Sequence, residues 1–287
     1  MVVYLNGQFL PAADAKISVL DRGFIFGDGV YEVWRVIEGQ LFEHERHHRR
    51  LLSGLHSLRI DVPPADVDAL GGVAGRLVKE NGLERGEATF YVEITRGAAP
   101  RTHAFPPAGT KATILGMVSR FEVPHALRAS GATAITQPDT RWLHCDIKTV
   151  QLLPNCMAKQ QATEAGAMEA IYVRDGIVTE GTHTTVFAVK GGALYTHPAG
   201  PLILPSITRA VVLEIAKEQG VSIRETPFTI KELFTMDELF VSGTTTDVTP
   251  IVTVDGKRIG TGKPGPVSLS LYGGLQARLY GAAVGQR

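Results

Sequence analysis

Paired turn residues recur between β-rich runs in both halves of the chain, and they restrict the fold more than any other feature of the sequence. Each pair contains a glycine beside an asparagine, an acidic residue or a second glycine. Such pairs tolerate the positive φ angles of the tight turns that join antiparallel strands. The pairs occupy positions 6–7, 38–39, 175–176 and 191–192. The sequence therefore predicts two early hairpins and, between residues 168 and 197, a meander of about four strands.

Helical periodicity separates these β-rich regions. Four segments have a helical pattern. In each of them apolar residues recur three and four positions apart, or helix start and stop signals lie at the two ends. The predicted helices span residues 44–58, 67–80, 154–164 and 207–219. The last of them begins after Ser206, a good capping residue, and is the final helix that the pattern indicates. Residues 20–29 are expected to form a loop, and residues 141–149 are expected to form a strand.

Strands and helices mixed in this way indicate an α+β fold. The 287 residues are enough for about two domains. Prolines at 100, 106 and 107, followed by a break in the pattern, predict a boundary near residue 120. We therefore expect a smaller N-terminal domain, residues 1–120, and a larger, strand-rich C-terminal domain, residues 121–287.

The charge balance gives no indication of a polyanionic partner. Lysine plus arginine total 29 and aspartate plus glutamate total 29, so the net charge is zero. No apolar run reaches the roughly 20 residues of a membrane span, and the first residues do not resemble a secretion signal. Two cysteines are too few for a disulfide framework or a zinc site. We expect a cytoplasmic protein that binds no nucleic acid, membrane or metal, with the histidines at 44, 47 and 48 on a solvated helix face.

Two charged residues occur at the ends of β-rich stretches. Lys148 ends an apolar, strand-like stretch and is the only lysine or arginine between Arg141 and Lys159. An apolar environment favours the neutral amine, which attacks aldehydes, although a lysine at a sheet edge can also extend to water. Glu180 lies between two β-rich runs. It either faces water from a turn or faces a pyridine nitrogen, whose protonation it would favour.

Other segments carry groups that suit anions. Ile207 and Thr208 open a helix, where unpaired amides attract phosphate, and Thr244 and Arg50 would add a hydroxyl and a guanidinium. Each of these also has an ordinary interpretation as a helix start, a turn or a solvated arginine.

A loop near residue 100 carries two further candidates. Arg101 and His103 are two positions apart, so in an extended loop both side chains face one way and suit a carboxylate. The alternative is an exposed polar loop. The GDG at 27–29 is not a dinucleotide-binding motif, because the third glycine is missing and a strand pattern follows.

Six motifs occur in a fixed order along the chain, and this ordered combination is far more specific to one family than any single motif. They are DRGFIFGDGVYEV at 21–33, TRGAAPRTHAFP at 95–106, RWLHCDIKTVQLLPN at 141–155, VTEG at 178–181, ITRAVV at 207–212 and MDELFVSGTT at 236–245. In this combination the chain resembles, over nearly its whole length, the fold type IV pyridoxal phosphate (PLP) aminotransferases. It is most similar to the D-amino-acid aminotransferases, whose Arg-x-His pair is absent from the branched-chain enzymes.

The resemblance implies a two-domain fold type IV PLP enzyme and a role for each matching residue. Lys148 would be the catalytic residue that holds the cofactor and moves the substrate proton, Glu180 would face the ring nitrogen, and Leu204 would pack behind the ring. The implied phosphate-binding residues are Arg50, Ile207, Thr208 and Thr244. The implied carboxylate-binding residues are Tyr31, Arg101 and His103. The last two would reach in from the other subunit of a homodimer.

The implied activity is transfer of the amino group from a D-amino acid, such as D-alanine, to a 2-oxo acid, such as 2-oxoglutarate or pyruvate. An aminodeoxychorismate lyase, an (R)-selective amine transaminase and a PLP-binding carrier without turnover remain alternatives. The chain departs from the family at 182–185, where threonines and His183 replace serines and asparagine, and at Trp34 and Arg35. These changes are expected to alter the hydrogen bonds around Glu180 and the substrate preference.

Overall fold

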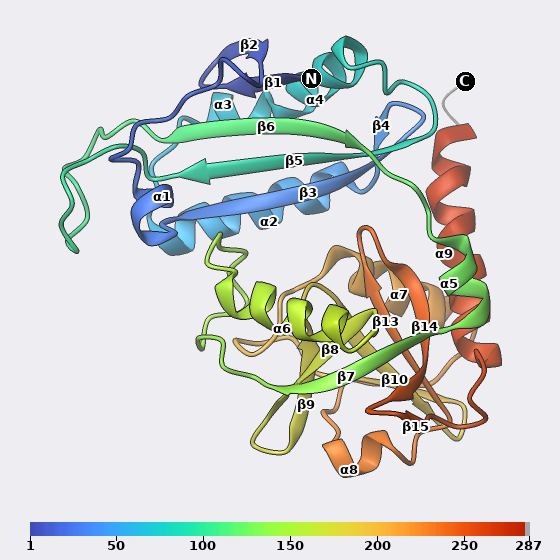
Figure 1. Cartoon of the computed structure of the whole chain (residues 1–287). Coiled ribbons are helices and arrows are strands. Elements are labelled where there is room, and N and C mark those ends of the chain that lie inside the picture. Colours follow the sequence, from blue (N-terminus) through green and yellow to red (C-terminus); the bar gives the residue numbers. More distant parts are fainter. Residues whose placement is uncertain (285–287) are drawn as a thin grey trace. The chain divides into compact units, whose positions relative to one another are not determined.

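The computed structural model describes residues 1–284, which form two compact units, each with its own β-sheet (Figure 1). Within the described residues, the first unit comprises residues 1–122, 147–151 and 282–284, and the second comprises residues 123–146 and 152–281. Within the described part of the chain, no helix combines the length and apolar character that crossing a membrane requires.

The first unit is a six-stranded antiparallel sheet with helices. Its strands follow the order β2-β1-β6-β5-β3-β4. The strands are β1 Val2–Leu5, β2 Gln8–Pro11, β3 Gly29–Ile37, β4 Gln40–Leu41, β5 Glu87–Thr95 and β6 Thr113–Arg120. The helices are α1 Arg22–Phe26, α2 His44–Leu58, α3 Pro64–Asp68 and α4 Leu70–Glu80.

Both predicted hairpins of this unit are confirmed. Asn6 and Gly7 have φ angles of 49° and 90°, and Glu38 and Gly39 have φ angles of 48° and 79°. These positive values let the turn twist in the same sense as the strands that it joins, so the pairs of residues determine the turn type locally.

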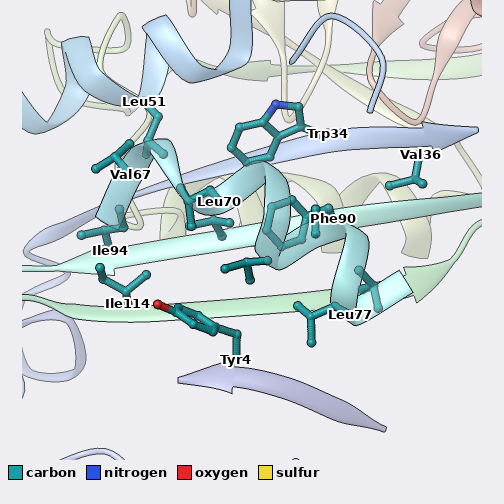
Figure 2. Packing of buried hydrophobic residues seen from close by; sticks show 14 of the residues in the cluster. Tyr4, Trp34, Val36, Leu51, Val67, Leu70, Leu77, Phe90, Ile94 and Ile114 are labelled. Atoms are coloured by element: carbon teal, nitrogen blue, oxygen red, sulfur yellow. The ribbon is translucent and has the colours of Figure 1, made fainter. Parts of the chain in front are cut away.

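The core of the first unit lies between the sheet and its helices. Figure 2 shows Trp34 of β3 beside Phe90 of β5, with Leu70 and Leu77 of α4 packed against them. The two aromatic rings are 5.4 Å apart, and both side chains are completely buried. Burial of Trp34 in this core and of Arg35 against Glu87 and Phe121 gives both residues a structural role within the first unit.

The second unit is built on a nine-stranded mixed sheet. Its order is β12-β11-β10-β13-β14-β7-β8-β9, with β15 paired to β14, and contacts between β9 and β10 show that the sheet curls. The strands are β7 Ala132–Pro138, β8 Glu169–Arg174, β9 Ile177–Gly181, β10 Thr185–Lys190, β11 Ala193–Thr196, β12 Ile223–Arg224, β13 Glu238–Gly243, β14 Asp247–Val254 and β15 Lys257–Arg258. The helices are α5 His125–Ser130, α6 Leu153–Glu164, α7 Ile207–Glu218, α8 Ile230–Leu233 and α9 Pro266–Val284.

The helices at 154–164 and 207–219 are confirmed as α6 and α7. The four strands predicted between residues 168 and 197 are present as β8 to β11, but they form two separate hairpins, β8-β9 and β10-β11, and not one continuous meander. The turn pairs at 175–176 and 191–192 all have positive φ angles. The Ser206 side chain caps α7 by accepting a hydrogen bond from the amide of Arg209.

Four sequence-based predictions of local structure are wrong. The expected loop at 20–29 contains α1, because the Asp21 side chain caps a helical turn that ends at Gly27. The helix at 67–80 is divided at Ala69 into α3 and α4. The expected strand at 141–149 is irregular apart from one bridge at its end. The helix at 207–219 is not the last, since α8 and α9 follow it.

Candidate functional site

The backbone around Lys148 lies along the edge of β3. β4 pairs only with Val36 and Ile37 of this strand, so the amides and carbonyls before them are open to another partner on that side. The segment 147–151 uses this edge: the amide of Tyr31 donates to the Lys148 carbonyl at 3.0 Å, and the amide of Val150 donates to the Gly29 carbonyl at 3.1 Å. Lys148 and Tyr31 are therefore held together by their main chains.

The Lys148 amine lies over the face of the Tyr31 ring. Its Nζ lies 4.0 Å from the ring centroid, and the side chain is half-buried. Tyr31 in turn stacks on Tyr91 at 5.7 Å, and the Tyr91 hydroxyl donates to Glu93 at 2.7 Å. Burial and then Glu93 raise the pKa of Tyr91, so its hydroxyl stays protonated. The backbone of Lys148 is thus bound to the edge of β3, and its amine lies against the Tyr31 ring, which Tyr91 supports.

Arg50 belongs to a buried charge cluster on the helix side of β3. Glu32, which follows Tyr31, has no exposed surface and accepts hydrogen bonds from Arg50 Nε at 2.8 Å, from Arg50 Nη2 at 2.6 Å and from His47 Nδ1 at 2.9 Å. Burial alone would raise the pKa of Glu32, but Arg50 and His47 hold it well below its usual range. Burial lowers the pKa of His47 despite the neighbouring carboxylate.

The expected solvated face is therefore wrong for His47, which is 2% exposed. The interpretation of Arg50 as a solvated arginine is also wrong. Alternation along β3 explains the arrangement, because successive side chains leave a strand on opposite faces.

Arg101 and His103 lie in an exposed loop beside α1. The Arg101 guanidinium is 5.2 Å from the ring centroid of Phe26, and the His103 ring is 5.8 Å from the same ring. The two candidates are thus neighbours, as expected. Among the described residues of the single chain, no interaction joins either of them to Tyr31.

Glu180 is buried in the second unit, so a turn position facing water is excluded. It is the penultimate residue of β9, and 6% of its surface is exposed. One carboxylate oxygen accepts from the Leu204 amide at 3.0 Å, and the other accepts from Arg141 Nη1. Burial raises the pKa of Glu180 to about 7, against the opposing effect of Arg141. Glu180 and Leu204, two of the predicted residues, are therefore in direct contact.

Arg141 and Asp139 are functional candidates that the sequence interpretation missed. Asp139 accepts from Arg141 Nε at 2.9 Å and from Arg141 Nη2 at 2.8 Å, and its side chain is completely buried. The motif at 141–155 contains the arginine, but its partner Glu180 lies 39 positions away. The spacing of residues within a motif cannot predict the contact between Arg141 and Glu180.

The chain leads from Leu204 directly into the start of α7. Ser206 caps the Arg209 amide, whereas the amides of Ile207 and Thr208 have no hydrogen-bond partner among the described residues. Both residues are buried. Two unpaired amides and a threonine hydroxyl at a helix start make a donor set that suits a phosphate.

Thr244 lies in the turn between β13 and β14. The turn is closed by a hydrogen bond from the Thr246 amide to the Gly243 carbonyl at 3.1 Å. A buried ion pair of 2.7 Å between Arg128 and Asp247 supports it from the β14 side. The segment that contains Thr244 is therefore a turn, which agrees with its ordinary interpretation, and a buried ion pair anchors that turn.

The unusual residues after Glu180 bind a different carboxylate. Thr182 and Thr184 donate through their hydroxyls to Glu169, which is completely buried, and His183 Nδ1 lies 3.3 Å from the same carboxylate. An added Cβ at Gly181 would lie 2.1 Å from the Thr184 hydroxyl, so only glycine fits there. The threonines thus support the end of β9, and none of the interactions found links their side chains to Glu180.

The two units together contain the functional groups that a phosphorylated pyridine aldehyde requires. The first unit offers the amine of Lys148, and the second offers the carboxylate of Glu180 and the donors at the start of α7. No cluster of three or more histidine, cysteine, aspartate or glutamate side chains within the described residues could hold a metal ion.

Comparisons with known proteins agree over almost the full length of the chain. The family model of amino-transferase class IV matches residues 29–254. The D-alanine aminotransferase of Staphylococcus haemolyticus is 40% identical over 273 residues, which cover 95% of this chain and 96% of that protein. The D-alanine aminotransferase of Bacillus licheniformis is 40% identical over 276 residues, 96% of each chain.

Solved structures share the fold. The branched-chain amino acid aminotransferase of Escherichia coli matches with a TM-score of 0.87 and 26% identity, over 98% of this chain and 93% of that one. The T.th. branched-chain amino acid aminotransferase, complexed with N-(5'-phosphopyridoxyl)-L-glutamate, matches with a TM-score of 0.86 and 28% identity, over 98% and 94% of the two chains.

Proposed function

Since this chain belongs to the class IV amino-transferase family, we propose that it transfers the amino group of a D-amino acid, such as D-alanine, to a 2-oxo acid with the help of pyridoxal 5'-phosphate. The structural observation that carries this proposal is Glu180, a buried carboxylate anchored by Arg141 and the Leu204 amide. Arg141 and the Leu204 amide hold this carboxylate in place, and a fixed, buried carboxylate can stabilise a further cation such as a protonated pyridine nitrogen. The preference for D-amino acids rests on the D-alanine aminotransferases at 40% identity.

When bound, PLP supplies an electron-withdrawing ring that stabilises negative charge at the substrate α-carbon. Lys148 Nζ would hold the cofactor and, when free, would carry the proton from the substrate α-carbon to C4′ of the cofactor. Glu180 would face the ring nitrogen and favour its protonation, and Leu204 would pack behind the ring. The amides of Ile207 and Thr208, the hydroxyls of Thr208 and Thr244, and Arg50 would bind the phosphate.

The substrate carboxylate is held by Tyr31, Arg101 and His103. The last two are exposed in the single chain, and we propose that they serve the site of a second copy in a homodimer. A fixed carboxylate decides which face of the α-carbon meets Lys148, and thereby the stereochemistry. We place the protein in the cytoplasm, where both free cysteines would stay reduced.

One spectroscopic experiment tests the proposal. The purified PLP-loaded protein is mixed with D-alanine and with L-alanine in turn, and its visible absorbance is followed. We expect D-alanine to bleach the visible band and 2-oxoglutarate to restore it, with at most a slow response to L-alanine.

Three other results would point to other activities. Faster bleaching by L-alanine would contradict the D-preference. Faster bleaching by (R)-1-phenylethylamine than by D-alanine would favour an amine transaminase. Release of pyruvate from aminodeoxychorismate without any 2-oxo acid would favour a lyase.

A further inference from the structure

Arg141 is fixed in position against Glu180. Its Nη1 donates to one Glu180 oxygen, while Nε and Nη2 form a two-point contact with Asp139 at 2.9 and 2.8 Å. The side chains of all three residues are at least nine-tenths buried. A forked contact of this kind fixes the guanidinium plane as well as its position.

A further set of contacts prevents Arg141 from turning away. Asp139 is also held by Arg174 Nη2 at 3.0 Å and by the Thr179 hydroxyl at 3.0 Å. The ring centroid of Tyr172 lies 4.5 Å from the Arg141 guanidinium. Arg141 is therefore a permanent, immobile positive charge in contact with Glu180.

The balance of charges at Glu180 depends on this arginine. Burial raises the pKa of Glu180 to about 7, and Arg141 is the principal influence that lowers it. Asp139 acts in the opposite direction but is bound to two arginines. Burial raises the pKa values of the nearby Cys145 and Tyr172, the former to about 11, so both are neutral near pH 7.

A carboxylate facing a pyridine shares one proton with it. The pair exists either as a carboxylate and a protonated nitrogen or as a carboxylic acid and a neutral nitrogen. The two forms contain the same atoms and electrons, and they differ only in whether the proton is bonded to nitrogen or to oxygen. A positive charge against the carboxylate favours the first form, because it stabilises the negative oxygen.

We propose that Arg141 is a positioning residue that keeps this proton on the cofactor ring nitrogen, an inference that rests on the proposed function. The ring withdraws electrons effectively only in its protonated form. Arg141 would thus act through its contact with Glu180.

The test uses the complete protein loaded with PLP that carries ¹⁵N in the ring. The ¹⁵N chemical shift reports directly whether the nitrogen is protonated, independently of turnover. At about pH 7.5 we expect a protonated nitrogen in the wild type, and a fall of about tenfold or more in the protonated-to-neutral ratio in Arg141→Met. A change of that size is typical for loss of a hydrogen bond to a charged group.

Three further variants isolate the cause. Arg141→Gln should behave like Arg141→Met and replaces it if the methionine variant does not fold. Arg141→Lys should retain most of the protonation, because the charge remains. Arg278→Met is the control: it removes another ion-paired arginine of the second unit, which contacts Glu214 and Glu218 and has no described contact with Asp139, Arg141 or Glu180, and it should leave the shift unchanged.

A folded Arg141→Met or Arg141→Gln variant with the wild-type ¹⁵N shift would overturn the assignment. If the wild type nevertheless binds PLP and transaminates D-alanine, the proposed function survives that result. A wild type that fails to bind PLP would instead refute the proposed function itself.

Discussion

Two buried carboxylates near the candidate functional residues are each bound to an arginine. Glu32 binds Arg50, and Glu180 binds Arg141. Replacement of a buried ion pair by apolar residues of similar volume is often neutral or stabilising, so such pairs are poor evidence of a purely structural role. Their placement beside Tyr31 and Leu204 is better explained by the chemistry that we propose.

Replacement of Lys148 by alanine tests the most critical residue. We expect Lys148→Ala to fold but to lose the visible absorbance of lysine-bound PLP and about 10³-fold or more of its turnover, because both the covalent link and the proton carrier are removed. Absorbance and D-alanine turnover check this. Lys79→Ala, at an exposed position on α4, is the control and should match the wild type. Full activity in Lys148→Ala would end the assignment.

The pH dependence of stability tests the burial of Glu180. Because its pKa rises from 4.5 to about 7 on folding, the folded apoprotein binds this proton more tightly than the unfolded chain. The resulting stabilisation is present below pH 4.5 and is lost as the pH rises to about 7, by about 3 kcal/mol in total. Urea unfolding of cofactor-free protein at about pH 5 and about pH 8 measures the loss, and Glu180→Gln should show less of it. Equal losses in both proteins would contradict the burial.

At the scale of elements, the edge of β3 organises the first half-site. This strand donates and accepts the hydrogen bonds that hold 147–151, and its alternation sends Tyr31 and Glu32 to opposite faces. α2 supplies His47 and Arg50 to the second of these faces. One strand thus supports the lysine on one side and a buried charge cluster on the other.

The loop between β5 and β6 is expected to control recognition of the substrate carboxylate. In Arg101→Ala we predict a rise in KM for D-alanine of about 10- to 100-fold, since a charge-assisted hydrogen bond is lost. The rise should be smaller for an amine without a carboxylate. Steady-state kinetics with both substrates measure the difference, and Arg85→Ala, another exposed arginine of the first unit, serves as the control. An unchanged KM would show that the loop does not hold the carboxylate.

At the scale of the whole molecule, the first unit exposes apolar side chains that an isolated chain has little reason to present. Val19 and Phe24 are 76% and 74% exposed, and Ile17 and Leu20 are about half exposed. These side chains lie within the segment that contains α1, against whose Phe26 Arg101 and His103 pack. A surface of this kind is typical of an interface, which supports the proposed homodimer.

Assembly and cofactor binding are both measurable on the intact protein. We expect sedimentation to give a dimer, and PLP at about 100 times its dissociation constant to stabilise the folded state by about 2.7 kcal/mol if the unfolded chain does not bind it. Thermal unfolding with and without PLP measures the second effect, which should be smaller in Lys148→Ala. A monomer at micromolar concentration would refute the shared carboxylate site.

Local chemistry made the hairpins and several helices predictable. The turn pairs at 6–7 and 38–39 require positive φ angles that asparagine and glycine adopt readily, and Ser206 caps α7 wherever that helix packs. The motifs around Lys148 and Glu180 were also recognisable, because their order along the chain is itself the signal. The hairpins and helices depend on neighbours a few residues apart, and the motifs are themselves stretches of sequence, so all of them can be read from the sequence alone.

Only the tertiary structure decided which charges meet. The contact of Arg141 with Glu180 spans 39 positions, and the pairing of segment 147–151 with β3 spans more than 110. The burial of His47 was missed because an isolated helix does not show which strand will cover it. Such contacts arise when the chain closes long loops around a core, and neither periodicity nor spacing specifies the partner.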